Sequence, residues 1–393
     1  MKIAIVGNTN NFPYLLGVGL RNLGYDVTLF VNSKYQLNRP ENRDWRYRFW
    51  KSSWIRDYSH IDEQEYFSVT AGVRELVSEL EKAELVIAND IGPSLLPLMR
   101  KKVRSVALLT GSDLTYYASQ DLPVFRVPSI DDADPATNAL RRQWRTEIKE
   151  FVARQRAGIL SSETISYFPP GIDIAADMMF KEIGADHLRT THICLAETHR
   201  VKYSVPSNRR ALRIFCATRL NFGTLLNTRS DLDNKGSDIM IKGLGLFYEK
   251  TRLSLDIHLV RKGDSVKEIE ALCRTCGIDS LVTWHDTMSL PKIWKWFRRS
   301  DIVFEQFGKS MVGMAGLDAM ATGRPVIANA KPDISDFKLP VCQAETPEEV
   351  AGQLELLQDR EFRIQKGKLG REYVERELSP EANAERLMKK LEI

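Results

Sequence analysis

The sequence predicts an α/β fold made of two doubly wound domains that face each other across a ligand cleft. With 393 residues, the chain is too long for one ordinary hydrophobic core, so two domains of about 150–200 residues are expected. Short apolar runs alternate with helical patterns, which is typical of parallel βαβ units. The alternation lapses in the middle of the chain and then restarts. We therefore expect domains at residues 1–205 and 206–375, and a final helix at 376–393 that could pack back on the first domain.

In the first half, strands are expected where a short apolar run ends in a turn-rich loop. KIAIV (Lys2–Val6) is the first, and helical spacing follows over Pro13–Leu23, with Pro13 suited to a first helical turn. A charged helix near Thr137–Arg156 lies in the stretch where the alternation lapses. Further strands are expected at Asp26–Val31, Glu84–Asn89 and Arg104–Thr110, with a helix near Pro93–Arg100.

The second half repeats the pattern more regularly, beginning with the strand LRIFCATR (Leu212–Arg219). The tail from Pro347 to Ile393 is helical throughout. The other strands are expected at Ser254–Val260, Leu281–Trp284, Asp301–Phe304 and Pro325–Ala328, with helices between them.

Composition excludes several classes of protein. Apolar residues make up 43% and charged residues 27%, close to globular averages, which argues against a disordered, collagenous or membrane-spanning chain. The net charge of +4 gives little support to nucleic-acid binding. The N-terminal MKIAIVGNTNN becomes polar too soon for a secretory signal, and five scattered cysteines indicate a reducing cytoplasm. The lone CxxC of Cys273 and Cys276 is interpreted as structural.

The familiar phosphate-binding loops are missing. The loop after Val6, GNTNNFP, contains neither GxGxxG nor GxxxxGK[ST]. Gly7 nevertheless ends a strand at the carboxyl edge of the sheet, where open α/β sheets bind ligands. Gly7 is therefore a candidate to line the cleft, and Gly17-Val18-Gly19 is interpreted as a helix-packing feature.

The most informative segment is DIVFEQFGKSMVGMAGLDAMATGRPVIAN, residues 301–329. It reads as a strand, a loop with Gly308 and Gly313, a helix carrying Asp318, and a further strand. A glycine-bearing loop entering a helix can offer backbone N–H groups to an anion. The Asp318 carboxylate either reaches a hydroxyl-rich ligand or is an ordinary solvated side chain.

This segment resembles the C-terminal signature of retaining glycosyltransferases of the GT-B fold, in particular glycosyltransferase family 4. DAMATGRPVI matches the ending of that signature, with Asp318 in the place of its second glutamate and Ser310 in the place of its first. Some relatives carry a DQ-containing strand and a glycine before the helix, and Glu305-Gln306 and Gly313 fit that version. The resemblance implies two facing Rossmann-like domains and places Ser310, Gly313 and Asp318 at the sugar-nucleotide donor.

A second match lies in Ala217–Phe247, which resembles the donor-diphosphate region of the same family. Arg219 follows the first strand of the second domain, and Lys235-Gly236 open its next helix. A leaving diphosphate needs fixed cations, so Arg219 and Lys235 are the candidate catalytic residues, against a reading as solvated surface cations. Trp284-His285 follows a predicted strand of the second domain, where relatives often hold the nucleotide base.

The resemblance is weaker in the first half, where LLTGSDL (Leu108–Leu114) is similar to a GSD segment of some members. Many relatives have a histidine just before it; here Leu109 and Thr110 stand there, so no catalytic histidine is assigned. Asp113 is either an acceptor-side residue or a helix N-cap.

The family chemistry implied by the resemblance is sugar transfer with retention, without a cofactor and without an essential metal. The donor is a nucleotide-diphosphate sugar, and the acceptor is expected to be a glycan or a lipid-linked molecule. Asp231-Leu232-Asp233 has the metal-binding DxD form, which occurs easily by chance. The alternatives are a sugar-nucleotide epimerase of the same architecture and a binding protein without catalysis.

A basic and aromatic region extends from Lys34 to Tyr58 and includes Trp45 and Trp50. These side chains could stack on an acceptor sugar, contact an anionic membrane surface at the inner face of the cell membrane, or pack on the first domain. No nucleic-acid-binding motif accompanies them, so a nucleic-acid partner is not expected.

Overall fold

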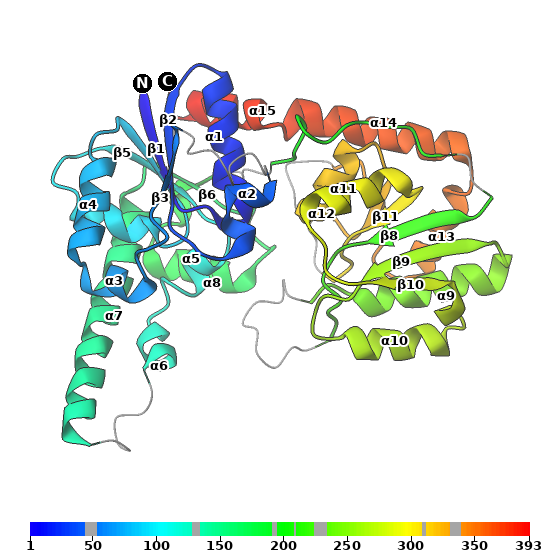
Figure 1. The fold of residues 1–393 in the computed structure, drawn as a ribbon, viewed down its shortest axis with the longest axis horizontal. Helices are drawn as coiled ribbons and strands as arrows, with labels where there is room; N and C mark the ends of the chain where they lie inside the picture. Colours follow the sequence, from blue (N-terminus) through cyan, green and yellow to red (C-terminus); the bar gives the residue numbers. More distant parts are fainter. Residues whose placement is uncertain are drawn as a thin grey trace. The chain divides into compact units, whose positions relative to one another are not determined.

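The computed structural model describes residues 1–43, 53–127, 134–190, 195–207, 210–223, 234–308, 312–330 and 339–393. The chain divides into two compact α/β units (Figure 1). The first consists of Met1–Phe168, Ile174–Cys194 and Asn383–Ile393, and the second of Pro169–Asp173 and Leu195–Ala382. The second unit thus begins its main segment at Leu195, whereas the sequence pattern placed the division after residue 205.

The described part of the first unit is built on a seven-stranded parallel sheet in the order β3-β2-β1-β4-β5-β6-β7. The strand runs expected in this half are confirmed, with ends that differ slightly. The strands are β1 (Lys2–Val6), β2 (Asp26–Val31), β3 (Ile55–Asp57), β4 (Leu85–Ala88), β5 (Arg104–Leu108), β6 (Thr164–Ser166) and β7 (Arg189–Thr190).

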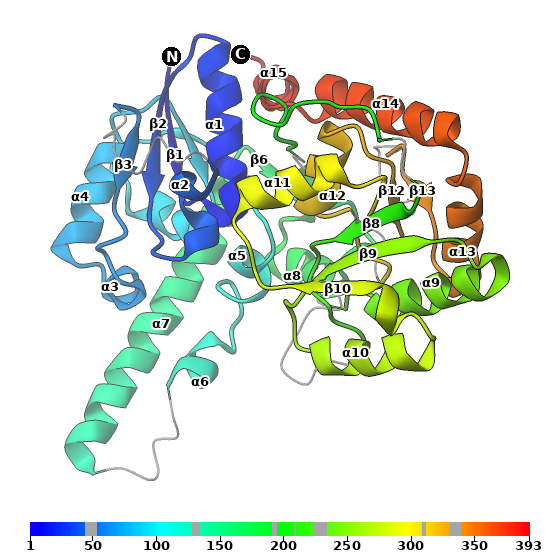
Figure 2. The ribbon, with the colours of Figure 1, turned by 45° about the vertical axis from the view of Figure 1, so that its right-hand side comes forward.

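Helices cover both faces of this sheet, with α1 and α4 on opposite sides in both views (Figures 1 and 2). The α-helices are α1 (Phe12–Asn22), α2 (Pro40–Arg43), α3 (Glu63–Ser68), α4 (Ala71–Leu80), α5 (Ser112–Thr115), α6 (Leu122–Arg126), α7 (Pro135–Ser161) and α8 (Ile174–Ile183). The short 3-10 helices are η1 (Thr9–Asn11), η2 (Gln36–Asn38), η4 (Gly92–Leu98) and η5 (Asp186–Leu188).

One helix expected from the sequence is of the 3-10 type. The helix expected near Pro93–Arg100 is the 3-10 segment η4, which contains Pro97. A proline inside a helix lacks the N–H for an i→i−4 bond and its ring clashes with the preceding turn. The helix expected there is therefore present, as a 3-10 helix.

The packing interpretation of Gly17 is supported by the structure. A Cβ atom on Gly17 would lie 2.9 Å from the ring of Trp54, so only glycine lets that indole lie against α1. Trp54 is buried and stacks on Tyr14 with ring centroids 5.8 Å apart. At least one aromatic residue of the basic and aromatic region therefore packs on the first unit.

The described part of the second unit is built on a six-stranded parallel sheet in the order β10-β9-β8-β11-β12-β13. The strand runs expected in this half are confirmed as well. The strands are β8 (Leu212–Cys216), β9 (Leu255–Val260), β10 (Val282–His285), β11 (Ile302–Phe304), β12 (Val326–Ala328) and β13 (Cys342–Gln343).

Helices also lie on both faces of the second sheet, with α9 and α10 on one side and α11 and α12 on the other (Figures 1 and 2). The tail is helical, as expected. The elements are α9 (Ser237–Thr251), α10 (Val266–Thr275), η7 (Asp279–Leu281), α11 (Leu290–Arg299), α12 (Met314–Ala321), α13 (Pro347–Leu356), α14 (Arg360–Glu377) and α15 (Pro380–Lys390). The described cysteines are free, in line with the structural interpretation of the CxxC pair.

Both sheets share one topological feature that positions ligands. In each, the first strand of the unit, β1 or β8, lies between the second strand and a later one, so the chain changes direction of winding there. Ligands of doubly wound sheets bind outside the carboxyl ends of the strands at this point. The loops that follow these strands are therefore where the functional residues are to be found.

Candidate functional site

The site of the second unit is built from loops at the carboxyl edge of its sheet. Arg219 follows β8, and Lys262 follows β9. Lys235 and Gly236 immediately precede α9, and Glu305 follows β11. Four segments that are far apart in the chain thus bring charged side chains to one edge.

Asn221 holds three of these segments together. Its backbone carbonyl accepts from the N–H of Lys235 at 3.0 Å, and its N–H donates to Ser237 Oγ at 3.1 Å. Its side-chain Oδ1 accepts from the N–H of Asp264 at 2.8 Å. Because Asn221 is buried, these bonds are protected from water and fix the loops that carry the cations.

Two glycines let the Lys235 loop lie directly on the loop after β11. A Cβ on Gly236 would be 2.6 Å from the backbone N of Gly308, and a Cβ on Gly308 would be 2.3 Å from the carbonyl O of Asn234. Gly236 also has φ +59°, a left-handed conformation that favours glycine. The Lys235 carbonyl accepts from the N–H of Phe307 at 2.8 Å, which closes this contact.

Three cations gather at this edge. Desolvation by the surrounding protein and the charge of Arg219 lower the pKa of Lys262. The N–H of Leu220, next to Arg219 in the chain, donates to the Lys262 carbonyl at 2.7 Å, so the loops that carry these two cations lie against each other. Burial raises the pKa of Glu305, and the charge of Lys235 offsets part of that rise. The N–H of Phe307, two residues after Glu305, donates to the Lys235 carbonyl at 2.8 Å, so the Lys235 loop lies against the loop after β11.

Sequence reasoning found Arg219 and Lys235 but missed Lys262. The available signal was the Lys262-Gly263 pair, which comes shortly after the buried parallel strand β9.

Glu305 is a buried carboxylate that organises the entrance to α12. Oε1 accepts from Thr218 Oγ1 at 3.1 Å, and Oε2 accepts from the N–H groups of Gln306 at 2.9 Å and Gly313 at 3.1 Å. Burial raises the pKa of Glu305, while these donors lower it. We expected the N–H of Gly313 to be available to an anion. Instead it donates to the carboxylate of Glu305. The assignment of Gly313 to the donor site stays a prediction.

Asp318 is also directed into the second unit. It is buried on α12, where Oδ2 accepts from Trp294 Nε1 at 2.9 Å and Oδ1 accepts from the N–H of Glu197 at 3.4 Å. These bonds show that Asp318 is not a solvated side chain. Its carboxylate orients the indole of Trp294. Its proposed contact with a donor sugar stays a prediction.

His285 lies at the end of β10 in an aromatic cluster. Its Nε2 is 2.9 Å from His258 Nδ1, and both imidazoles lie against the ring of Trp296, with centroids 4.7 and 4.4 Å away. Burial lowers the pKa of both histidines. The assignment of His285 to the nucleotide base stays a prediction.

In the first unit, Gly7 and Asp113 lie at the carboxyl edge of the sheet. Gly7 has φ +87°, and a Cβ there would be 2.3 Å from the carbonyl O of Asn89, so glycine is needed for the packing of the loop after β1 on the loop after β4. Asp113 is buried and accepts from the N–H groups of Thr110 at 2.8 Å and Gly111 at 2.8 Å. Desolvation raises the pKa of Asp113 to about 6 in spite of these donors. Asp113 therefore closes its own loop, and an acceptor contact stays a prediction.

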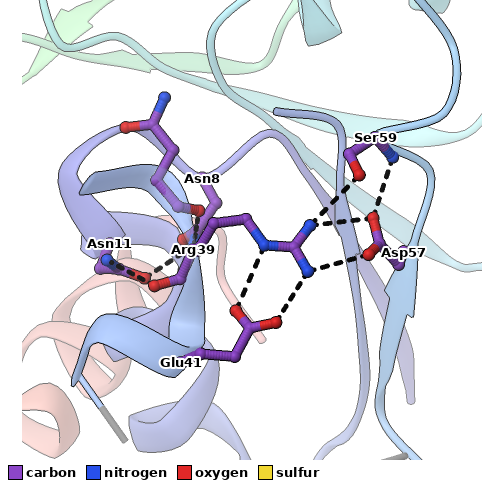
Figure 3. A network of polar contacts seen from close by, with 7 residues as sticks. Asn8, Asn11, Arg39, Glu41, Asp57 and Ser59 are labelled. Carbon is purple, nitrogen blue, oxygen red and sulfur yellow. Dashed lines mark hydrogen bonds and ion pairs between the residues drawn. The ribbon is translucent and has the colours of Figure 1, made fainter. Parts of the chain in front are cut away.

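A second polar network of the first unit ties together the loops after β1, β2 and β3 (Figure 3). Asn8 Nδ2 donates to Asn11 Oδ1 at 2.8 Å, and Asn11 Nδ2 donates to the carbonyl of Arg39 at 3.2 Å. The Arg39 guanidinium pairs with Glu41 at 2.7 Å and with Asp57 at 2.8 Å. Arg39 lowers the pKa of Asp57 to about 2. Two carboxylates thus neutralise one cation of the basic and aromatic region.

Several predicted residues lie outside the described part of the chain: Trp45, Trp50, Ser310, Asp231 and Asp233. Within the part that is described, no group of three or more potential metal ligands occurs, and no helix is long and apolar enough to span a membrane.

Comparison with known sequences finds distant relatives. No protein-family model matches the chain. The D-inositol 3-phosphate glycosyltransferase of Xylanimonas cellulosilytica is 26% identical over 208 residues, which is 53% of this chain and 44% of that protein. Its counterpart in Arthrobacter sp. strain FB24 is 28% identical over 98 residues, or 24% of this chain and 23% of that protein. The chain spans less than half the length of these curated relatives.

Solved structures resemble the chain over its whole length. Sucrose-phosphate synthase from Thermosynechococcus elongatus has a TM-score of 0.57 at 14% identity and covers 100% of this chain and 98% of its own. A glycosyltransferase from Rickettsia africae has a TM-score of 0.59 at 12% identity, with coverages of 99% and 97%. The N-terminal domain of trehalose-6-phosphate phosphatase from Candida albicans has a TM-score of 0.58 at 11% identity, with coverages of 100% and 96%. These similarities show the fold, two Rossmann-like domains of the GT-B type, and confirm the fold class predicted from the sequence.

Proposed function

We propose that the protein is a glycosyltransferase that moves a sugar from a nucleotide-diphosphate sugar to a glycan or lipid-linked acceptor. The observation that carries this proposal is that backbone hydrogen bonds join the loops of Arg219, Lys235 and Lys262 at the carboxyl edge of the second sheet. The GT-B fold and the glycosyltransferase names of the curated relatives support it.

The cations suit the chemistry of a diphosphate leaving group. When the bond between the anomeric carbon and the phosphate oxygen breaks, negative charge develops on that oxygen and must be stabilised. A guanidinium can grip two phosphate oxygens as a fork, and ammonium groups act as point charges. Asn221 and the glycine contact fix the backbone of the loops before the substrate binds, so little reorganisation is needed.

Retention and independence of a metal are further parts of the proposal. They rest on the resemblance of the Asp301–Asn329 segment to family 4 enzymes. In a front-face reaction, the departing phosphate oxygen takes the proton of the acceptor hydroxyl while that hydroxyl bonds to the anomeric carbon. No protein nucleophile is required for this route.

Nucleotide binding tests the donor site. Calorimetry with UDP-, GDP-, ADP- and TDP-sugars should identify one nucleotide, and Arg219→Ala and Lys235→Ala should each weaken its binding about tenfold or more, since charge-assisted hydrogen bonds contribute about 1.5–3 kcal/mol. Arg274→Ala and Lys267→Ala are matched controls, because both residues are exposed on α10. Unchanged affinity in both site variants would refute the assignment.

A binding protein without catalysis is the second candidate. The bonds that hold Asp318 against Trp294 and Glu197 favour it, because they occupy the carboxylate that takes the place of the family's second glutamate. Tight nucleotide-sugar binding without turnover across a broad acceptor panel would support this candidate. Interconversion of the donor without any acceptor would support an epimerase instead.

We also propose a cytoplasmic location with contact at the inner face of the cell membrane. Tyr35 and Leu37 of the basic and aromatic region are exposed apolar side chains beside Lys34, a mixture that suits an anionic lipid surface. Co-sedimentation with vesicles of anionic and of zwitterionic lipid tests this; equal binding to both, or to neither, would contradict it.

A further inference from the structure

The side chain of Glu305, directly after β11, lies in a space that two glycines at the start of α12 leave open. A Cβ on Gly313 would be 2.8 Å from Glu305 Oε1, and a Cβ on Gly316 would be 2.9 Å from Glu305 Cγ. Cβ atoms essentially never approach other atoms within 3.0 Å, so a side chain at either position would displace the carboxylate. Glu305 is 4% exposed, and its carboxylate therefore acts on groups of the protein itself.

The backbone that carries Glu305 is fixed on the second sheet. Its N–H donates to the Ile327 carbonyl of β12 at 3.1 Å. The carbonyl of the next residue, Gln306, accepts from the N–H of Asn329 at 2.9 Å. The side chain of Glu305 thus extends from the end of a paired strand, which is a more precise support than a free loop.

From this support the carboxylate joins the loop after β8 to the start of α12. Oε1 accepts from Thr218 Oγ1 at 3.1 Å, and Oε2 accepts from the N–H of Gly313 at 3.1 Å. Thr218 directly precedes Arg219 in the chain. One buried carboxylate therefore holds the loop that carries Arg219 at a set distance from α12.

We propose that Glu305 is a positioning residue of the donor site, which places the Arg219 guanidinium for the donor diphosphate through the hydroxyl of Thr218. The role of Arg219 toward a diphosphate rests on the proposed function, whereas the placement of its loop does not. Charge-assisted hydrogen bonds depend on geometry, so a displaced Arg219 loop weakens the grip on the phosphates even though Glu305 never contacts them.

Thr218→Val tests this link without changing Glu305. Valine keeps the shape of the side chain and removes only the hydroxyl, so we expect Kd for the nucleotide sugar found by calorimetry to rise about fivefold. Thr251→Val is the matched control, because that hydroxyl donates to the Phe247 carbonyl within α9 at 2.8 Å. Equal nucleotide affinity in Thr218→Val and in the natural chain would overturn the proposal.

Two substitutions of Glu305 separate positioning from a general loss of packing. Glu305→Ala should raise Kd about tenfold, since nothing then holds the Arg219 loop. In Glu305→Gln, the amide oxygen can still accept from the Gly313 N–H and the amide nitrogen can donate to Thr218 Oγ1. Glutamine should therefore recover most of the affinity that alanine loses. Equal losses in the two variants would overturn the proposal, because they would show that the charge and not the placement matters.

Hydrogen exchange without any ligand separates this proposal from the proposed function. We expect faster exchange over residues 217–222 in Glu305→Ala than in the natural chain, and a return toward the natural rate in Glu305→Gln. If the natural chain binds no nucleotide sugar, the proposed function fails, and the exchange measurement alone decides whether Glu305 places the loop. Unchanged exchange over residues 217–222 in Glu305→Ala would overturn that placement.

Discussion

At the scale of single residues, Lys262 shows how a site can assemble from residues that no motif connects. Its backbone carbonyl accepts from the N–H of Leu220 at 2.7 Å, next to Arg219 in the chain. The following residue, Gly263, has φ +120° and would place a Cβ 2.6 Å from Leu220 N. The loop after β9 thus lies directly on the loop after β8, and this contact brings the two cations together.

Lys262→Ala should weaken nucleotide-sugar binding about tenfold, because one charge-assisted contact to the diphosphate is lost at an exposed position. Calorimetry measures the change, with Lys267→Ala as the control. An effect no larger than that of the control would remove Lys262 from the site.

The paired acids Asp90 and Asp113 should make the first unit less stable as pH rises. Burial raises their pKa from 3.8 to about 7 and about 6, so the folded state binds their protons more tightly than the unfolded state. Their contribution is therefore complete below about pH 4 and is lost as pH rises through 6 and 7. Asp57, with its pKa lowered to about 2, acts in the opposite sense, and its contribution is lost as pH falls below about 4.

Asp90→Asn should flatten this dependence between pH 5 and 8 and stabilise the chain at pH 8 by on the order of 2 kcal/mol. Urea unfolding at each pH measures it, with the exposed Asp121→Asn as the control. A parallel profile for Asp90→Asn and the natural chain would show that Asp90 is not the titrating group.

At the scale of elements, Gly236 shows how much of the site depends on the approach of two loops. In Gly236→Ala, the alanine would have to adopt φ +59°, and its Cβ would lie 2.6 Å from Gly308 N. The Lys235 loop must shift, and we expect nucleotide affinity to fall at least tenfold, since a misplaced phosphate ligand loses its hydrogen bonds.

Gly352→Ala is the matched control for that substitution. It lies on α13 with no atom within 4 Å of the added Cβ, and it should raise stability by about 0.5–1 kcal/mol without touching nucleotide binding. Circular dichroism and calorimetry on both variants separate folding from binding. Full affinity in Gly236→Ala would show that the loop contact is not needed.

The elements themselves were largely predictable, and the site only in part. The strands Lys2–Val6 and Asp26–Val31 were predictable because a buried parallel strand is a short run of apolar residues, and such a run is visible in the sequence itself. The partners of Glu305 and Asp318 were not predictable, because they come from residues such as Thr218 and Trp294 that only tertiary packing brings near.

At the scale of the whole molecule, neither compact unit is a continuous piece of chain. The short segment Pro169–Asp173 belongs to the second unit although the residues before and after it belong to the first. Asn383–Ile393 belongs to the first unit although the helices before it belong to the second. The far end of the chain thus completes the first unit.

Removal of residues 383–393 should consequently destabilise the first unit. Leu387, Met388 and Leu391 are buried, and each fully buried apolar side chain contributes about 1.5–3 kcal/mol. Arg104, at the start of β5, would also lose the bond of 2.7 Å that its Nη2 donates to the Leu391 carbonyl. Hydrogen exchange on the shortened chain measures the loss strand by strand. We expect faster exchange in β1, β4 and β5 and unchanged exchange in β8 and β9. Equal acceleration in both sheets would mean that the two units unfold as one. No acceleration would mean that the last helix is dispensable.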